Sequence, residues 1–383
     1  MLIAAIVSFR LGGPDGVSVQ AETWGQALRE LGFSLRRVAG ELTDGPRPGD
    51  VVVPGLGVAV EAAPGPEGQR PGRAVAPDPA ELHAALEGAA VVVVENLLAL
   101  PLNLAAARVL TTVLVDRLGD GVHVLLHHHD LAWQRPETAH MTELPPHLPG
   151  ALHVVINDFS RQELFERGIE AVTVSNAFDL DAAPGRREET RVALGLGAGD
   201  VLVLQPTRAI ARKNIPDALR LSEGLAERLA DPVHYWLPGP AEDGYAPVLR
   251  EVLAGARVPV LRQHPAELAL AGAPAGMADA YAACDLVVFP STEGEGFGQP
   301  VIESVAAGRP LAVARYRALE EILTLGFEFL PAGDPAAVAE ALLRPDRAVA
   351  ERNLALARRH FSLAALVDRL RGLLNGPAPG SRS

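Results

Sequence analysis

The sequence predicts an α/β protein of two domains, each built on a parallel β-sheet. In both halves of the chain, short apolar runs rich in β-forming residues alternate with segments that have helical spacing of apolar residues. The 383 residues exceed what one small core accommodates. The stretch from Asp285 to Pro310 has the pattern of a strand, a glycine-rich loop and a helix, which is the repeating unit of such sheets.

The expected strands are short apolar runs bounded by turn residues, and the expected helices mostly end at glycine or before proline. Strands are predicted at residues 2–7, 50–54, 90–94, 122–126 and 151–156, and then at 201–205, 234–237, 258–261, 286–289, 311–314 and 327–330. Helices are predicted at residues 20–31, 79–86, 104–118 and 161–167 (with Ser160 as N-cap), and then at 188–194, from 216, at 277–283, from 300, and at 334–343, 348–360 and 363–374.

Composition restricts the partners and the compartment. The net charge of -13 argues against nucleic-acid binding and against docking on an anionic membrane. The single cysteine, Cys284, gives no internal disulfide framework and fits a reducing cytosol. Residues 1–9 lack the basic start of a signal peptide, and the apolar segment 96–115 is interrupted by polar residues and proline. We therefore expect a cytoplasmic protein.

The central stretch combines glycines with two spaced acids. The run from Leu286 to Phe289 predicts a buried strand, and a helix is expected from Pro300 onward. The loop between them places glycines at 294, 296 and 298, and the acids Glu295 and Glu303 are separated by seven residues. A glycine loop before a helix presents backbone N–H groups at the positive end of the helix dipole, which suits an anion.

This pattern resembles the Glu-x7-Glu signature of retaining glycosyltransferases of the GT-B fold, in particular glycosyltransferase family 4 (glycosyl transferases group 1). The surrounding Pro-Ser-x-x-Glu-Gly-Phe-Gly and Ala-Ala-Gly-x-Pro patterns match as well. The resemblance implies two Rossmann-like domains that face a central cleft. It also implies that Glu295 contacts hydroxyls of the donor sugar and Glu303 the nucleotide ribose, while the amides of Gly296, Phe297 and Gly298 face the sugar and phosphates.

The segment from Pro206 to Ile215 resembles the family's Gly-Arg-x-x-x-x-Lys-Gly segment, whose two cations bind the donor diphosphate. Arg208 and Lys213 keep that spacing, whereas Thr207 and Asn214 stand where the family has glycine. Two cations can stabilise a departing nucleoside diphosphate without a metal ion. The resemblance therefore implies a metal-independent enzyme without a cofactor, for which the nucleotide-sugar is a co-substrate.

A second glycine loop follows the first expected strand and contains Gly12 and Gly13. It resembles the Gly-Gly-x-x-x-x-Ser loop of the family, which faces the donor phosphates and the acceptor. A plain turn is the alternative interpretation of the residues themselves.

Three consecutive histidines, His127 to His129, end a predicted strand. We expect no metal site here, because successive residues of a strand end point in different directions, whereas metal-binding histidines converge. The following His-Asp pair resembles the strand-end histidine of the family, which lies near the donor sugar. His129 matches that position best, and His128 is the alternative.

Four further residues are candidates for the acceptor site. Asn96 and Asn103 follow a predicted strand, where loop asparagines also commonly cap helices. Trp133 could stack on a sugar and Arg135 could bind an acidic group of the acceptor. For Trp133 and Arg135, packing within the loop is the alternative.

By the same resemblance, the domains are residues 1–178 for the acceptor and 179–360 for the nucleotide-sugar. Residues 361–375 resemble the terminal helix that crosses back to the first domain, and 376–383 form a flexible tail. A Pro/Gly-rich surface loop is expected at 61–77.

The predicted function is transfer of a hexosyl group from a UDP- or GDP-linked sugar to an acceptor hydroxyl, with retention of configuration. The acidic total charge favours a small molecule or a saccharide as acceptor over a lipid. A GT-B sugar-nucleotide 2-epimerase and a non-catalytic sugar-nucleotide sensor are the alternatives. The residues do not identify the base, the sugar, the acceptor or the oligomeric state.

Overall fold

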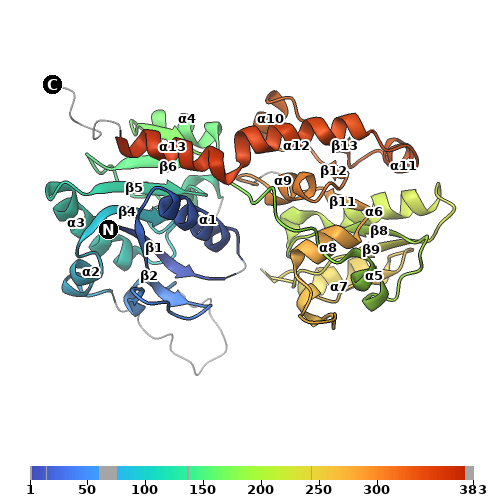
Figure 1. The fold of residues 1–383 in the computed structure, drawn as a ribbon, viewed down its shortest axis with the longest axis horizontal. Coiled ribbons are helices and arrows are strands. Elements are labelled where there is room, and N and C mark those ends of the chain that lie inside the picture. The colour runs from blue at the N-terminus through green and yellow to red at the C-terminus, as the bar shows by residue number, and fades with distance from the viewer. Residues whose placement is uncertain are drawn as a thin grey trace. The chain divides into compact units, whose positions relative to one another are not determined.

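The computed structural model describes residues 2–13, 15–59, 76–135, 138–242, 244–292 and 294–375. Contacts divide the chain into two compact units: unit 1 comprises Met1–Ala177 and Leu363–Ser383, and unit 2 comprises Phe178–Ser362. Each unit consists of a parallel sheet with helices on both faces (Figure 1). The predicted loop at 61–77, apart from its last two residues, and the predicted tail at 376–383 lie outside the described residues.

The sheet of unit 1 has the strand order β3-β2-β1-β4-β5-β6-β7 in the described part of the chain, with parallel pairing throughout. Its strands are β1 (Ile3–Leu11), β2 (Ser34–Leu42), β3 (Val51–Val52), β4 (Ala89–Glu95), β5 (His123–His128), β6 (Leu152–Val155) and β7 (Ala171–Thr173). All seven carboxyl ends therefore lie along the same edge of the sheet.

Helices cover both faces of this sheet. One face packs against α2 (Pro79–Ala85) and α3 (Leu104–Gly119), and the other against α1 (Gly16–Glu30) and α13 (Leu363–Asn375). The last of these, red in Figure 1, lies beside α1. Alternate residues of β1 point to the two faces. Strands buried on both faces are continuously apolar, which is why the sequence reveals most of them.

Three elements of unit 1 differ from the prediction. Strand β2 was not predicted, because it carries adjacent arginines; Arg37 is nevertheless buried and forms ion pairs of 2.7 Å with Asp44 and 2.6 Å with Asp50. Helix α4 (Asp158–Phe165) begins earlier than expected, because the side chain of Asn157, and not Ser160, caps its first turn. The short edge strand β7 was not predicted either.

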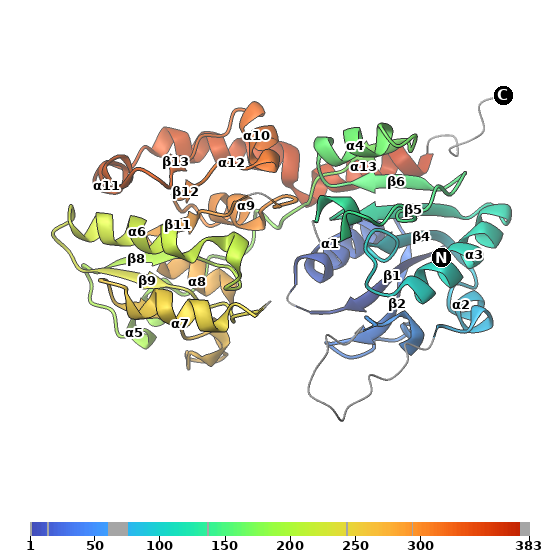
Figure 2. The same ribbon diagram turned by 180° about the vertical axis from the view of Figure 1, so that it is seen from behind.

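The sheet of unit 2 has the order β10-β9-β8-β11-β12-β13 among the described residues, again all parallel. Its strands are β8 (Val201–Leu204), β9 (Val233–Trp236), β10 (Val260–Leu261), β11 (Leu286–Phe289), β12 (Leu311–Val313) and β13 (Leu330–Pro331). Figure 2 shows α6 (Ile215–Ala226) and α7 (Ala246–Ala254) on the viewer's side of this sheet. The same core includes α11 (Pro335–Leu343).

The other helices of unit 2 are α5 (Arg187–Ala193), α8 (Met277–Ala283), α9 (Gln299–Ala306), α10 (Arg317–Thr324) and α12 (Arg347–Phe361). Helices α7 and α10 were not predicted, because each is short and rich in charged or exposed residues outside its buried face. The last strand lies at Leu330–Pro331 and not at 327–330. The predicted strand 286–289 and helix 277–283 have the observed bounds.

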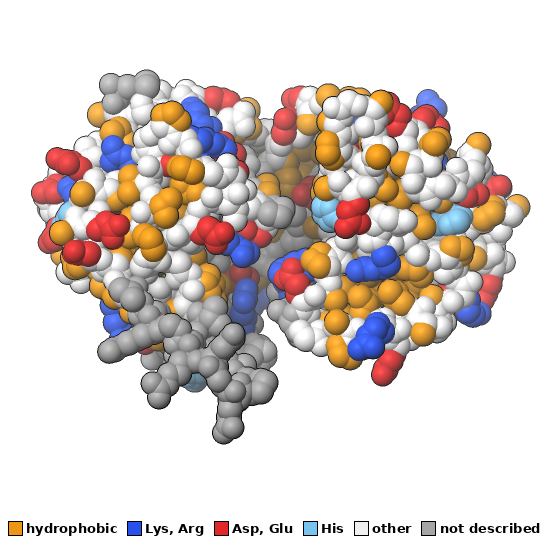
Figure 3. Space-filling model, turned by 90° about the horizontal axis from the view of Figure 1, so that it is seen from below, with side chains coloured by type: hydrophobic (Ala, Val, Ile, Leu, Met, Phe, Trp, Pro, Cys, Tyr) orange, Lys and Arg blue, Asp and Glu red, His pale blue; other side chains and the backbone are white. Residues whose placement is uncertain are grey.

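The surface mixes charges of both signs. Figure 3 shows acidic, basic and apolar side chains interspersed on the visible face of each unit. Within the described residues, no helix has the length and apolar character needed to cross a membrane.

Candidate active site

The candidate residues of unit 2 follow two neighbouring strands at the centre of its sheet. Strands β8 and β11 pair in parallel, with Leu204 opposite Val287. The chain after β8 carries Arg208 and Lys213, and the chain after β11 carries Glu295. The carboxyl ends of parallel strands are where open α/β sheets bind ligands.

The structure brings Glu295 and Lys213 into direct contact. The Oε1 atom of Glu295 accepts hydrogen bonds from the Lys213 ammonium and from the guanidinium of Arg212, and both contacts are ion pairs. Glu295 and Lys213 are both buried, whereas the side chain of Arg212 is one-third exposed. A predicted sugar-binding acid and a predicted phosphate-binding cation therefore share one cluster, and Arg212 joins it.

The backbone around Lys213 is held by hydrogen bonds from two other segments of unit 2. The Gln205 amide donates a 2.7 Å hydrogen bond to the Lys213 carbonyl, and Thr292 N donates a 3.0 Å hydrogen bond to the Arg212 carbonyl. Asn214 adopts a left-handed conformation with φ of 51°, which asparagine tolerates better than most residues. This backbone explains how Asn214 can occupy a position where the family has glycine.

For both Glu295 and Lys213, burial shifts the pKa in one direction and the ion pair between them shifts it in the other. Burial disfavours the carboxylate of Glu295, but Lys213 and Arg212 outweigh it and hold the pKa of Glu295 below its ordinary value. For Lys213, burial outweighs the attraction of Glu295, and the pKa of the ammonium is lowered. A further anion at this position would raise the pKa of Lys213 again.

The second acid, Glu303, lies on α9 and is bound by a phenol. The hydroxyl of Tyr281 on α8 donates a 2.5 Å hydrogen bond to Oε2 of Glu303. Burial raises the pKa of Glu303, and the hydrogen bond from Tyr281 opposes that rise only in part. Tyr281 thereby fixes one oxygen of a carboxyl group that the family resemblance assigns to the ribose.

The loop before α9 can accommodate only glycine at one of its positions. Gly298 has φ of 84°, and a Cβ there would lie 2.1 Å from the Tyr316 hydroxyl. That hydroxyl donates a 3.0 Å hydrogen bond to the Phe297 carbonyl. The Phe297 ring is buried between Phe178 and Phe361, so the loop is anchored to the core of unit 2.

Arg208 lies at the periphery of this cluster. Its guanidinium is half-exposed and forms a 2.5 Å ion pair with Glu242. Its charge still influences Lys213, whose pKa it helps to lower. The structure therefore places Arg208 near the other two cations but gives it a different partner.

In unit 1, Gly12 and Gly13 lie between the carboxyl end of β1 and the start of α1. Gly12 has φ of 81°, and a Cβ there would lie 2.0 Å from Oδ1 of Asp44. Because Arg37 holds that carboxylate with a 2.7 Å ion pair, the loop can approach it only with glycine. This close approach requires glycine at position 12 independently of the predicted role of the loop in binding the donor phosphates.

The three histidines divide between the two faces of the sheet. His128 is buried and lies 3.0 Å from His153, ring nitrogen to ring nitrogen. His127 and His129 point to the opposite face, where each lies 2.8 Å from Oε2 of Glu95. The expectation that consecutive histidines diverge is thus right for His128 but wrong for the other two, because residues i and i+2 of a strand share a face.

Glu95, His127 and His129 are the group in the described structure whose donor set could hold a metal ion. Their ligand atoms all lie within 4.8 Å of one another. In the structure these atoms contact one another directly, and Trp24 stacks on the His127 ring at 4.2 Å between ring centroids.

The four candidate acceptor residues all have partners within unit 1. Asn103 caps α3 and donates to the carbonyls of Gly55 and Gly57. Trp133 donates to Glu163 and packs under the guanidinium of Arg167, and Arg135 forms a 3.0 Å ion pair with Asp130. Asn96 accepts two backbone hydrogen bonds from the histidine loop. Their acceptor roles stay predictions.

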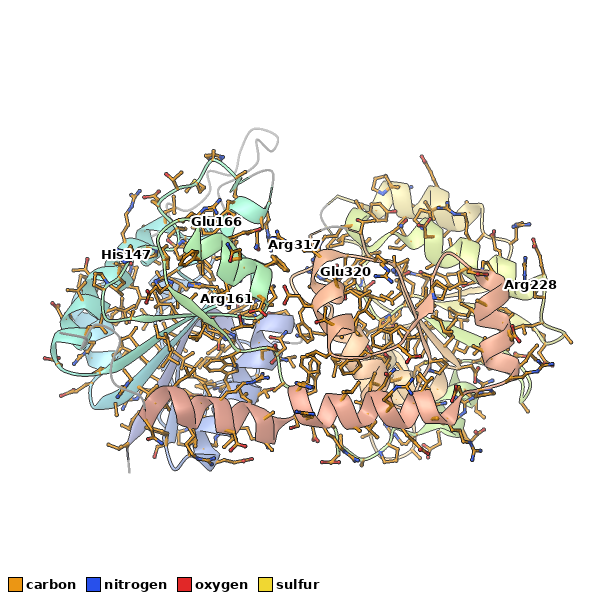
Figure 4. All side chains as sticks on the ribbon, turned by 90° about the horizontal axis from the view of Figure 1, so that it is seen from above. His147, Arg161, Glu166, Arg228, Arg317 and Glu320 are labelled. Atoms are coloured by element: carbon orange, nitrogen blue, oxygen red, sulfur yellow. The ribbon has the colours of Figure 1, made fainter. Side chains whose placement is uncertain are left out.

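Charged residues at the surface of either unit pair locally. Arg161 on α4 and Glu320 on α10 are labelled in Figure 4. Arg161 forms a 2.9 Å ion pair with Asp158, and Glu320 forms one of 2.8 Å with Arg315. A pocket of about 570 Å³ in unit 1 lies at the amino ends of β5 and β6 and is lined by residues such as His123 and Leu152. It is therefore at the opposite edge of the sheet from the histidines and glycines.

The sequence is similar to those of known proteins. Residues 218–345 match the family model described as "Glycosyl transferases group 1". The chain is 24% identical to mannosylglucosylglycerate synthase of Petrotoga mobilis over 88% of both chains, and 28% identical to that of Thermotoga maritima over 63% of this chain and 67% of the relative. The chain is a glycosyltransferase.

The fold comparison covers nearly the whole of this glycosyltransferase. The structure of Anabaena HepE in complex with UDP and glucose has a TM-score of 0.66 and 17% identity, with 98% of this chain and 99% of that chain covered. Together with the two parallel-sheet units, this similarity confirms the GT-B fold that the sequence predicted.

Three residues of the glycosyltransferase clusters were missed by sequence reasoning. Arg212 directly precedes Lys213, so the sequence already indicated a second cation next to the predicted phosphate-binding lysine. Glu95 ends an apolar strand, where an isolated acid is uncommon, and this too could have been noticed. Tyr281 carried no signal, because its contact with Glu303 depends on how α8 and α9 pack.

Proposed function

We propose that the chain is a retaining glycosyltransferase that moves a hexosyl group from a UDP- or GDP-linked sugar to an acceptor hydroxyl without a metal ion. The observation that carries the proposal is the cluster of buried Lys213 and Glu295 with the partly exposed Arg212, beside the glycine loop that opens α9. It combines cations for a diphosphate with a carboxylate for sugar hydroxyls.

Each group of the cluster has a distinct task in this proposal. Lys213 and Arg212, with Arg208 beside them, stabilise the charge that develops on the diphosphate as the glycosidic bond breaks. Glu303, oriented by Tyr281, binds the ribose. Glu295 binds the sugar, and the amides of Gly296, Phe297 and Gly298 support the sugar and phosphate region.

The acceptor hydroxyl attacks on the face from which the diphosphate departs. The departing phosphate takes the proton of the attacking hydroxyl, so the C–O bond to the diphosphate breaks as the new C–O bond forms on the same side. His129, the strand-end histidine of the family resemblance, assists the leaving phosphate or the acceptor in this proposal. No protein nucleophile is required, which agrees with a cluster whose acids are occupied in binding.

The relatives support a class of acceptor. Two curated relatives are mannosylglucosylglycerate synthases. We infer that this chain transfers a mannosyl group to a small, glycosylated hydroxy acid of the glucosylglycerate type. Such an acceptor carries a carboxylate, for which Arg135, half-exposed and paired with Asp130, is the candidate cation.

A thermal-shift panel tests the donor half of the proposal. UDP, GDP, ADP and their sugar conjugates are added with magnesium or with EDTA, and the expected result is stabilisation by one nucleotide that persists in EDTA. Stabilisation that requires the metal would contradict metal independence, and no stabilisation would remove the diphosphate site. The products formed in the same mixtures separate the alternatives. A donor sugar isomerised in the absence of acceptor would indicate a sugar-nucleotide 2-epimerase, and nucleotide binding without turnover of the donor would indicate a sensor.

A further inference from the structure

Strand pairing brings one acid and two imidazoles to the same face of the unit 1 sheet. Glu95 on β4 is the register partner of His127 on β5, and His129 lies two residues beyond His127. Because side chains of a strand alternate, all three point to the face covered by α1. The carboxyl ends of β4 and β5 are also the edge at which α/β sheets bind ligands.

A single oxygen of Glu95 binds both rings. Oε2 lies 2.8 Å from Nδ1 of His127 and 2.8 Å from Nε2 of His129. Burial opposes ionisation of Glu95, but His127 and His129 outweigh it and lower the pKa of Glu95 to about 2. An ionised carboxylate only accepts hydrogen bonds, so both ring nitrogens that face it carry their protons.

The main chain of His129 is held as firmly as its ring. Asn96 adopts a left-handed conformation with φ of 58°, and its Oδ1 accepts hydrogen bonds from the backbone N–H groups of His129 and Asp130 at 3.1 and 3.3 Å. Glu95, the last residue of β4, therefore holds the ring of His129, and Asn96, the next residue, holds its backbone.

Burial of the Glu95 carboxylate in this arrangement lowers the stability of the folded chain. Glu95 is fully buried, and within the described residues its Oε1 has no hydrogen-bond partner and no lysine or arginine pairs with it. Burying a carboxylate without a strong cation opposes folding, and the four residues before it are all valine. Unsatisfied buried groups of this kind are concentrated at functional sites.

We propose that Glu95 is a positioning residue: it holds the His129 imidazole by its Nε2–H and so presents Nδ1 to the reacting groups. The inference rests on the proposed function, in which His129 is the strand-end histidine that assists the reaction. His127, which shares the carboxylate oxygen and is covered by Trp24, limits the rotation of Glu95.

The kinetic test replaces the carboxylate by its amide. Glu95→Gln offers an N–H that can donate to His129 and permit the other tautomer, so kcat is expected to fall at least about tenfold, with KM for the donor changed less than about threefold. Glu95→Asp, which keeps the carboxylate, is expected to recover part of kcat. His153→Asn is the control, because His153 is an equally buried histidine on the opposite face.

Histidine-selective ¹⁵N NMR provides a readout that does not depend on turnover. His129, assigned by comparison with His129→Asn, is expected in the Nε2–H form in the wild type and in a changed tautomer mixture in Glu95→Gln. An Nδ1–H form in the wild type, or a kcat of Glu95→Gln equal to wild type, would overturn the proposal. So would about one tightly bound zinc per chain that Glu95→Gln loses, since the triad would then be a metal site. If the wild type transfers no sugar but the tautomer result holds, the proposed function fails and the positioning contact stands.

Discussion

The phenol of Tyr281 on α8 donates a 2.5 Å hydrogen bond to Oε2 of Glu303 on α9. We predict that Tyr281→Phe lowers the affinity for the nucleoside diphosphate about tenfold, because a hydrogen bond to a charged group contributes about 1.5–3 kcal/mol. Isothermal titration calorimetry of the wild type, Tyr281→Phe, Glu303→Gln and the double variant measures this. If Tyr281 acts through Glu303, the double variant binds no more weakly than Glu303→Gln; additive losses would contradict that link.

Lys213 and Arg212 should both contribute to nucleotide binding. Replacing either by methionine removes one cation from the cluster, and we predict at least about a tenfold loss of affinity for each variant. Arg220→Met is the matched control, because Arg220 is a largely exposed arginine of the same unit on α6. Equal affinities for all three variants would show that the cluster is not the diphosphate site.

Glu295 should separate binding from transfer. In Glu295→Gln, Lys213 and Arg212 lose their carboxylate partner and become available to the diphosphate, so nucleotide affinity is expected to stay equal or to increase. Transfer is expected to fall at least about a hundredfold, because the carboxylate that accepts hydrogen bonds from the sugar hydroxyls is lost. Calorimetry and an initial-rate assay on the same preparation test both parts. Unchanged turnover would refute the assignment of Glu295 to the donor sugar.

Stability should decrease on acidification because of the buried His128–His153 pair. Burial, with the charge of His147 as a lesser cause, lowers the pKa of His153 to about 4, and burial also lowers that of His128. Between about pH 6.5, the ordinary histidine pKa, and about pH 4, the unfolded chain binds more protons than the folded one. The free energy of unfolding therefore decreases as the pH is lowered through this range. Each group contributes at most about 1.4 kcal/mol per pH unit.

Urea unfolding at several pH values between 7.5 and 4 measures this dependence. The variant His128→Leu/His153→Leu removes both titrating groups, so its free energy of unfolding should depend less steeply on pH than that of the wild type. Since acidic residues titrate in both proteins, only the difference between the two slopes is informative. Identical slopes would show that the pair does not control acid stability.

The sequence was sufficient for most of the fold because both sheets are parallel and buried on both faces. Strands such as β4 and β11 are continuous apolar runs, and glycine or proline marks the ends of helices such as α9. The prediction failed where local pattern and tertiary context disagree. Strand β2 holds a buried arginine that only Asp44 and Asp50 make acceptable, and these partners cannot be identified before the fold is known.

For the site, motif spacing identified residues but not their contacts. Lys213 and Glu295 were assigned separately to phosphate and sugar, and only pairing of β8 with β11 shows that they touch. For the histidines, the prediction that consecutive side chains diverge overlooked residues two apart. His127 and His129 lie on the same face of the sheet and both contact Glu95. Contacts across neighbouring strands depend on register, which a single sequence does not specify.

The stereochemistry of transfer in the absence of metal tests the central claim most directly. The wild-type protein is incubated in EDTA with an α-linked GDP- or UDP-hexose and an acceptor of the glucosylglycerate type, and the anomeric proton of the product is followed by ¹H NMR. The account predicts an α-linked product that accumulates at the same rate with EDTA as with magnesium. A β-linked product, or transfer that requires the metal, would contradict it.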